Sequence, residues 1–232
     1  MGILYIVPTP IGNMQDITLR AINVLQTVDV IACEDTRKTG LLLQKIASQS
    51  LQGDALRKPR LVSYYEQNEL QRIPEVIAAI KDGLNIALVS DAGTPAVSDP
   101  GFKLIRECIA EGIKIESLPG ASSVITALAV SGLPTDKFLF VGYPPKKPGH
   151  REMFFQNLAK LPIKTTIIFF EGPHHILRTL EGMKQVFGDT DIVICRELTK
   201  IYEEIRRETI SSSIEHFEKQ LPKGEFVILL HH

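Results

Sequence analysis

The sequence predicts an α/β protein made of two α/β domains: a first domain with a five-stranded, mostly parallel sheet and a second domain with a mixed sheet. Short apolar runs, each the length of a buried strand, alternate with amphipathic helical patterns along most of the 232 residues. This alternation is typical of parallel sheets, because two parallel strands need a long crossover connection between them. A polar stretch at 132–137 interrupts it. We therefore expect domains at 1–131 and 138–232, joined by this linker.

The first domain begins with an apolar strand at 3–7, which runs into a loop rich in proline and glycine. A helix follows, and we expect Asp16 to cap it because the apolar residues after it recur at helical spacing. Similar patterns predict the remaining elements of this domain. They are strands at 28–33, 61–63, 86–89 and 113–118, and helices at 39–47, 74–81, 102–112 and 122–130.

The second domain resumes the alternation and then departs from it. Helices are expected after a basic turn at 144–151, after the loop at 171–175, and at 213–220. Because the last part of the chain alternates differently, we expect its sheet to be mixed. The predicted strands are 138–141, 165–170, 191–195 and 225–230, with a further extended segment at 202–210.

Composition excludes some classes of protein. The net charge is −1, so no global positive field draws the chain to nucleic acid, and any RNA contact must use local basic patches. The cysteines Cys33, Cys108 and Cys195 lie in apolar patterns without metal or disulfide spacing. They are interpreted as reduced core thiols of a cytoplasmic protein. The apolar start at 3–7 is too short to span a membrane, so we expect no membrane association.

The loop at 90–101 organises the expected site. It follows a buried strand and precedes a helix, so it lies at the carboxyl edge of the sheet, where open α/β folds bind ligands. Its glycines and small residues let backbone amides approach a ligand. Asp91 can accept hydrogen bonds from ribose or ammonium groups, whereas a phosphate site favours bare amides and a lysine. Asp99 precedes Pro100 and is interpreted as a cap of the next helix.

Other loops rich in glycine or polar residues follow strands in both halves, so we expect the ligand in a cleft between the two domains. The motifs of P-loop ATPases, dinucleotide enzymes, zinc hydrolases and serine esterases are absent. His174 and His175 are adjacent and point in different directions, and no third ligand accompanies them. We therefore expect no metal site.

Six motifs occur in order along the chain: Pro8–Asn13, Cys33–Arg37, Ser90–Gly101, Pro119–Ser122, Glu171–His174 and Arg196–Lys200. Together they resemble the tetrapyrrole methylase superfamily, and within it the branch that methylates small-subunit ribosomal RNA. The resemblance covers essentially the whole chain. It implies a homodimeric methyltransferase that uses S-adenosylmethionine to methylate the ribose 2′-oxygen of a cytidine in 16S rRNA.

The resemblance also implies which residues of this chain contact the cofactor and the substrate. The substrate side is similar to the strand tips at 8–13, 34–37 and 64–69. The cofactor contacts fall on both domains: Asp91, Ala92, Gly93, Thr94, Val97, Ala121, Ser122, Phe170, Glu171 and Leu198.

Catalysis by this family is an in-line displacement, in which aligning the reactants supplies much of the rate. A ribose hydroxyl is a poor nucleophile, so a base within hydrogen-bond reach helps remove its proton. We hypothesise that Glu34 or Asp35 removes this proton or positions the hydroxyl, while Arg37 holds a phosphate. Asn68 completes the expected catalytic set. The family often has a histidine where this chain has Gln67, which moves the base role to the carboxylates. The alternative is that the segment around Asp35 only starts a helix with a surface ion pair.

A second departure concerns RNA binding. The family's rRNA members commonly continue into a small extra domain that this chain lacks, so either the chain is truncated or RNA affinity rests on basic groups at 57–60, 146–151 and 206–207. Two rival functions remain open. One is methylation of a small molecule such as a tetrapyrrole, and the other is RNA binding without catalysis.

Overall fold

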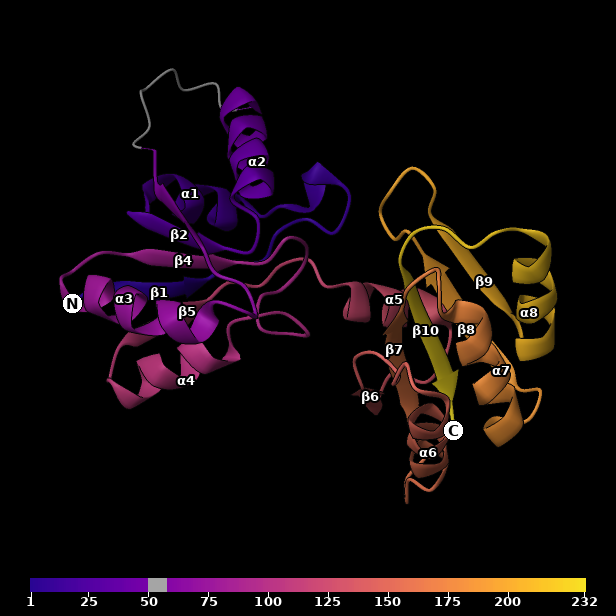
Figure 1. The fold of residues 1–232 in the computed structure, drawn as a ribbon. Helices are drawn as coiled ribbons and strands as arrows, with labels where there is room; N and C mark the ends of the chain where they lie inside the picture. The colour runs from indigo at the N-terminus through magenta and orange to yellow at the C-terminus, as the bar shows by residue number, and fades with distance from the viewer. Residues whose placement is uncertain (50–57) are drawn as a thin grey trace. The chain divides into compact units, whose positions relative to one another are not determined.

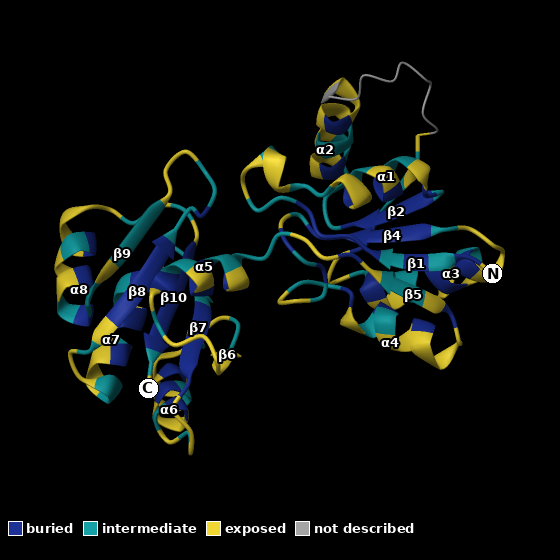
Figure 2. Ribbon diagram, turned by 180° about the vertical axis from the view of Figure 1, so that it is seen from behind, coloured by how far each residue is buried: buried dark blue, intermediate teal, exposed yellow. Residues whose placement is uncertain are grey.

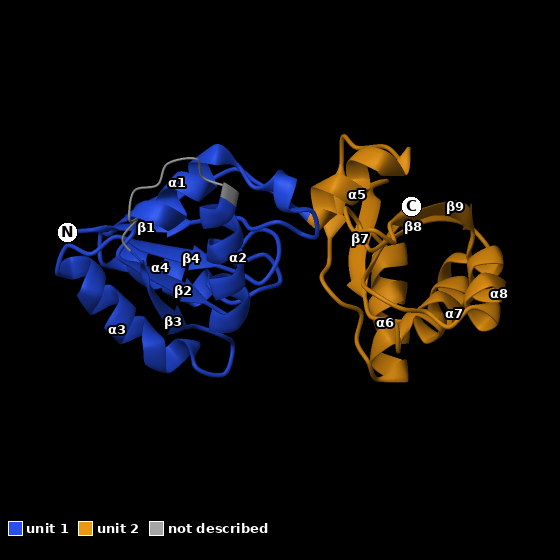
Figure 3. Cartoon of the chain, turned by 90° about the horizontal axis from the view of Figure 1, so that it is seen from above, with its two compact units in different colours: residues 1–122 blue, residues 123–232 orange. Residues whose placement is uncertain are grey.

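The computed structural model describes residues 1–49 and 58–232 (Figure 1). The chain divides into two compact units, Met1–Ser122 and Ser123–His232 (Figure 3). The division comes before helix α5 (Ser123–Ser131), whose buried Val124, Ala127 and Leu128 belong to the second unit. This helix contacts strands of the second sheet. The boundary therefore lies earlier in the chain than the expected linker at 132–137.

The first unit contains one sheet of five strands, all parallel, in the order β3-β2-β4-β1-β5. This confirms the predicted parallel sheet. The two strands β2 and β4 are buried along their whole length, as expected for parallel strands covered on both faces (Figure 2). The strands are β1 (Ile3–Ile6), β2 (Val30–Cys33), β3 (Arg60–Ser63), β4 (Ile86–Val89) and β5 (Lys114–Ser117).

Helices cover both faces of this sheet. Helices α1 (Leu19–Thr27) and α2 (Thr36–Gln49) pack on the face that presents Ile31, Ala87 and Val89. Helices α3 (Glu69–Lys81) and α4 (Phe102–Ala110) pack on the other face. Strands β1 to β4 contribute alternate side chains to the two cores, because successive residues of a strand point to opposite faces.

Two helix starts in this unit differ from the sequence prediction. Asp16 does not cap α1; it ends a short 3₁₀ helix, η1 (Met14–Asp16). The cap is Thr18, whose Oγ1 accepts a hydrogen bond from the backbone N–H of Ala21 at 3.1 Å. Helix α3 begins at Glu69, ahead of the predicted start, and contains Pro74. A proline inside a helix removes one backbone hydrogen bond. The helix continues past Pro74 because Val76, Ile77 and Ile80 on its apolar face are buried.

The second unit contains a mixed sheet, as predicted, and the order of its strands is β6-β7-β10-β8-β9. Strands β6 and β7 are parallel, and the other neighbours are antiparallel. The strands are β6 (Phe138–Phe140), β7 (Thr166–Glu171), β8 (Asp191–Arg196), β9 (Glu204–Thr209) and β10 (Phe226–His231), and the helices after α5 are α6 (Pro148–Ala159), α7 (Ile176–Phe187) and α8 (Ile210–Lys219).

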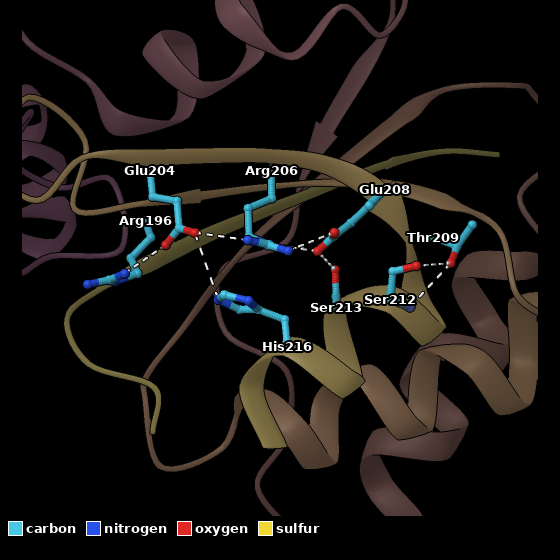
Figure 4. A network of polar contacts seen from close by, with 8 residues as sticks. All are labelled: Arg196, Glu204, Arg206, Glu208, Thr209, Ser212, Ser213 and His216. Carbon is cyan, nitrogen blue, oxygen red and sulfur yellow. Dashed lines mark hydrogen bonds and ion pairs between the residues drawn. The ribbon is translucent and has the colours of Figure 1, made fainter. Parts of the chain in front are cut away.

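A polar network lies along the edge strand β9 (Figure 4). Arg206 forms ion pairs with Glu204 and Glu208, which flank it on the same face of the strand. Glu204 also pairs with Arg196 of β8 at 2.7 Å. The neighbouring Arg207 donates hydrogen bonds to the carbonyl oxygens that end α5. Arg206 and Arg207, which were expected to contact RNA, are therefore both bound by ion pairs or hydrogen bonds to groups of their own unit.

Candidate functional site

The neighbouring strands β1 and β4 lie where the strand order of the first sheet reverses. Helix α1 leaves β1 over one face of the sheet and α4 leaves β4 over the other, so their loops separate at the carboxyl edge. Ligands of open α/β sheets bind at such a point. The two loops are tied together here: Thr9 and Gly93 exchange backbone hydrogen bonds of 2.9 and 3.0 Å. Thr9 is buried, and its hydroxyl donates to the carbonyl oxygen of Ser90.

The loop after β5 joins the same structure. The Thr94 hydroxyl donates to the carbonyl oxygen of Ala121 at 3.1 Å. Gly120 lies so close to Pro8 that an added Cβ would meet the Pro8 Cβ at 2.6 Å. The structure therefore brings the predicted cofactor loop at 91–94 and the predicted contacts at 121–122 together in one rigid cradle.

Val97 lies in the strained part of the β4 loop. Its neighbours Ala96 and Ser98 have φ values of 68° and 61°, a left-handed conformation that residues with a side chain seldom adopt. Strained backbone of this kind is concentrated at ligand sites. Val97 itself is 46% exposed, which leaves this apolar side chain accessible to a ligand.

Asp91 has one paired and one unpaired carboxylate oxygen. Its Oδ2 lies 2.6 Å from the Nζ of Lys38, a residue in the first turns of α2. Its Oδ1 is buried and accepts no hydrogen bond from any residue that the structure describes. A buried, unsatisfied acceptor costs free energy until a donor reaches it. The carboxylate thus fits the role predicted for it, acceptance of a hydrogen bond from a ligand. Sequence reasoning missed Lys38.

Glu34 and Asp35 lie at the tip of β2 in different environments. Asp35 accepts three hydrogen bonds from Arg37: one from the backbone N–H, one from Nε and one from Nη2. These bonds hold the pKa of Asp35 well below its usual range, which makes this carboxylate a poor base. Burial raises the pKa of Glu34, and the carboxylates of Asp99 and Asp91 raise it further. Of the two residues expected to act on the hydroxyl, only Glu34 has the environment for it.

Asp99 is not the helix cap that the sequence predicted. The residue preceding α4 is Gly101, and no side chain caps this helix. Asp99 is half-buried in the loop after β4. Burial and the charge of Asp91 raise the pKa of Asp99 to about 6, against the hydrogen bond from Ser90. The aspartate–proline pattern indicated a cap because it describes only neighbours in the chain, whereas the helix begins two residues later, after Gly101.

Asn68 shapes the loop after β3. Its Oδ1 accepts a hydrogen bond from the backbone N–H of Tyr65 at 2.8 Å, and its Nδ2 donates to the carbonyl oxygen of Ser63 at 3.1 Å. Next to it, the buried Glu69 accepts a hydrogen bond from Tyr64 and pairs with Lys103 of α4 at 2.6 Å. The amide of Asn68 therefore fixes the shape of this predicted substrate loop, and the Glu69 cluster anchors it to α4.

The predicted cofactor contacts of the second unit lie at the carboxyl ends of β7 and β8. Phe170 is half-buried, and its ring contacts those of Phe140 and Tyr143 at centroid distances of 4.8 and 5.5 Å. Leu198 is buried between two residues of positive φ, Glu197 and Thr199. Both side chains are held in place by their own unit.

Glu171 is buried and both of its carboxylate oxygens are used. Oε1 accepts a hydrogen bond from the backbone N–H of Gly172 at 2.8 Å. Oε2 accepts one from the hydroxyl of Thr179, in α7, at 2.5 Å. These bonds join the end of β7 to α7, so Glu171 stabilises the loop that follows the strand.

Replacing Thr179 with valine is expected to lower the free energy of unfolding of the second unit by about 1–3 kcal/mol, because a buried carboxylate oxygen loses its donor while the side-chain shape is kept. Urea denaturation followed by circular dichroism measures this change. Thr135→Val, at an exposed loop position, is the matched control. Equal stability of the two variants would contradict the structural role of the Thr179–Glu171 bond.

No helix within 1–49 and 58–232 has the length and apolarity to cross a membrane. In the same residues, no group of three or more histidine, cysteine, aspartate or glutamate side chains is arranged to hold a metal ion. The three cysteines are buried and unbridged.

Comparison with known proteins identifies the family. Residues 3–213 match the Tetrapyrrole (Corrin/Porphyrin) Methylases. A protein of Thermotoga maritima named Ribosomal RNA small subunit methyltransferase I is 43% identical over 230 residues, which are 99% of this chain and 98% of the relative. A protein of the same name from Hydrogenobaculum is 45% identical and covers 98% of this chain and 94% of its own length.

Solved structures show the same fold. A uroporphyrin-III-C-methyltransferase from Thermus thermophilus superposes with a TM-score of 0.65 at 21% identity, over 99% of this chain and 94% of that one. Another structure of such an enzyme from the same organism, complexed with S-adenosyl homocysteine, has a TM-score of 0.65 at 16% identity, over 98% of this chain and 97% of that one. The match over residues 3–213 and the near full-length identity to the relatives lead to one conclusion. This chain belongs to the tetrapyrrole (corrin/porphyrin) methylase family.

Proposed function

We propose that this chain is a cytoplasmic methyltransferase that uses S-adenosylmethionine to methylate the ribose 2′-oxygen of a cytidine in 16S rRNA of the small ribosomal subunit. The observation that carries the proposal is the near full-length identity, 42–45%, to relatives named for methylation of small-subunit rRNA. The structural neighbours named for uroporphyrin methylation are only 14–21% identical to this chain, so they support the fold alone.

The cofactor would bind at the cradle around Asp91. The unpaired Oδ1 of Asp91 needs a donor, and the ribose hydroxyls and the ammonium group of S-adenosylmethionine are suitable donors. The backbone at Gly93 and Thr94 and the loop at Ala121 and Ser122 would line the same site. When bound, the cofactor supplies an electrophilic methyl group on a sulfonium.

Alignment would be the main contribution of this chain to the reaction. The loops after β1, β4 and β5 are locked by the Thr9–Gly93 and Thr94–Ala121 hydrogen bonds, so they hold a ligand in one position. Glu34, at the tip of β2, would accept a hydrogen bond from the substrate hydroxyl and orient it. Arg37 would contact a phosphate, since its side chain is 88% exposed while Asp35 fixes its direction.

Contacts to the phosphates of the RNA would come from local basic groups, because the net charge of −1 does not attract RNA to the whole chain. Lys146, Lys147 and His150 are exposed and suit this role. Arg151 is buried and donates to the carbonyl oxygen of Lys146, so it supports the turn that carries them. Arg57, part of another predicted cluster, lies outside the described residues. A homodimer is part of the proposal.

The proposal is tested by incubating the protein with methyl-labelled S-adenosylmethionine and small ribosomal subunits from a strain that lacks this rRNA modification. We expect label in 16S rRNA, at a dinucleotide that resists alkaline hydrolysis because its 2′-oxygen is methylated. Subunits that already carry the modification are the matched control and should accept no label. Label transferred to a free tetrapyrrole but not to RNA would establish the rival function instead.

A further inference from the structure

The loops after β2, β3 and β4 begin side by side at the carboxyl edge of the first sheet. In the register of these parallel strands, Cys33 lies opposite Ser63 on one side and opposite Val89 on the other. The backbone N–H of Tyr64 extends this alignment past β3, because it donates to the carbonyl oxygen of Cys33 at 2.7 Å. The loop at 64–68 therefore starts beside the tip of β2.

Hydrogen bonds within the loop at 64–68 fold it into a turn. The backbone N–H groups of Asn68 and Glu69 donate to the carbonyl oxygen of Tyr65 at 3.0 and 2.9 Å, in addition to the bonds of the Asn68 amide. Glu66 and Gln67, at the tip, are exposed. The shape of the turn is thus set locally, whereas its orientation on the sheet depends on how its two ends are held.

Glu69 holds both ends. It is the first residue of α3, and its side chain is only 6% exposed. Its Oε2 accepts a hydrogen bond at 3.2 Å from the hydroxyl of Tyr64, which is itself buried, and its Oε1 lies 2.6 Å from the Nζ of Lys103. Removing one partner of a buried ion pair is costly, because it leaves the other charge buried and uncompensated. The loop is therefore fastened to Lys103 by a charge that needs this partner.

Lys103 stands at the end of the loop that was predicted to bind the cofactor. It is the second residue of α4, two positions after Gly101. Gly101 packs on β4, since an added Cβ there would meet Leu88 Cδ2 at 2.7 Å. The Glu69–Lys103 pair thus joins the loop at 64–68 to the point where the loop at 90–101 returns to its own strand.

We propose that the Glu69–Lys103 pair positions the loop at 64–68 for contact with the RNA substrate. This inference rests on the proposed function. Both residues act through the loop, so they are positioning residues. The cofactor loop does not depend on the pair in the same way, because the Thr9–Gly93 hydrogen bonds hold it from β1. Loss of the pair should therefore raise the KM for RNA and leave cofactor binding intact.

A second ion pair joins the same two helices at their other ends. Lys81, the last residue of α3, lies 2.6 Å from Glu111, which directly follows α4. This pair is as short as that of Glu69 and Lys103, but it is at the end of α3 from which the chain enters β4, away from the strand tips. It provides a matched control for the general effect of breaking a contact between α3 and α4.

The test measures KM and kcat on small ribosomal subunits and the affinity for S-adenosylhomocysteine by calorimetry. For Lys103→Met, KM should rise about tenfold, while kcat and the affinity stay within about twofold of wild type. Lys103→Arg keeps the cation and should return KM to within about twofold of wild type. Lys81→Met removes a partner from an exposed pair and should leave all three quantities unchanged.

Glu69→Gln tests the pair without leaving a buried charge, so it serves even if Lys103→Met does not fold. Its KM should rise about threefold, since the charge-assisted bond to Lys103 is lost while the amide oxygen still accepts from Tyr64.

Three results would overturn the positioning role: a wild-type KM in Lys103→Met, a wild-type KM in Glu69→Gln, or an equal rise of KM in Lys81→Met. In each of these cases the wild type still methylates RNA, and the proposed function stands. If the wild type labels no RNA, the proposed function fails and this inference fails with it.

Discussion

Replacing Asp91 with alanine is expected to weaken the binding of S-adenosylmethionine by about 10- to 100-fold. The buried Oδ1 of Asp91 accepts no hydrogen bond from the described residues, so a donor group of the ligand would supply the missing hydrogen bond. Hydrogen bonds to charged groups contribute about 1.5–3 kcal/mol, and each 1.4 kcal/mol changes an affinity about tenfold. Calorimetric titration with S-adenosylhomocysteine measures the effect without turnover.

Lys38→Met distinguishes the two oxygens of Asp91. It removes the partner of Oδ2 and leaves Oδ1 in place, so we expect a smaller loss of affinity than in Asp91→Ala. Asp82→Ala, at an exposed aspartate after α3, is the control and should bind as the wild type does. An Asp91→Ala variant that binds within twofold of wild type would show that the cofactor does not use this carboxylate.

Replacing Gly101 with alanine is expected to lower the free energy of unfolding of the first unit by roughly 2–6 kcal/mol. One contribution is backbone strain at a φ of 137°, which costs about 1–3 kcal/mol for a residue with a side chain. The other is overpacking against Leu88 Cδ2, 2.7 Å from the added Cβ, which costs about 1–3 kcal/mol. Because the chain has no tryptophan, circular dichroism during urea denaturation is the suitable measurement.

Gly83→Ala separates these two contributions. Gly83 also has a positive φ, 94°, but no heavy atom lies within 4 Å of an added Cβ. This variant should therefore show the strain without the overpacking, and lose less stability than Gly101→Ala. If the two variants lose the same amount, the close packing of the β4 loop on its strand contributes nothing measurable.

The order of the elements could be predicted from the sequence because it depends on neighbours along the chain. Continuous apolar runs such as 86–89 indicate strands buried on both faces, and β4 is indeed buried throughout. The same logic placed the loop at 90–101 at the carboxyl edge of the sheet. The predicted ends of helices were less accurate where a capping residue determines the first turn. Thr18 and Thr209 are the N-caps of α1 and α8, and the apolar periodicity does not mark their positions.

The ion pairs and hydrogen bonds of individual side chains at the candidate site were decided by tertiary contacts. The sequence placed Glu34, Asp35, Asp91 and Asp99 in strand-end loops, but could not state which carboxylate is paired with a cation. Arg37 donates hydrogen bonds to Asp35, Lys38 pairs with one oxygen of Asp91, and burial raises the pKa of Asp99.

The sequence by itself therefore determined the two α/β sheets, the loops that bear the candidate site and the resemblance to the methylase family, since these follow from patterns along the chain. Only the tertiary structure decided which carboxylates remain available for chemistry. Ion pairs and burial depend on groups far apart in the sequence, as the 2.6 Å contact of Lys38 with Asp91 illustrates.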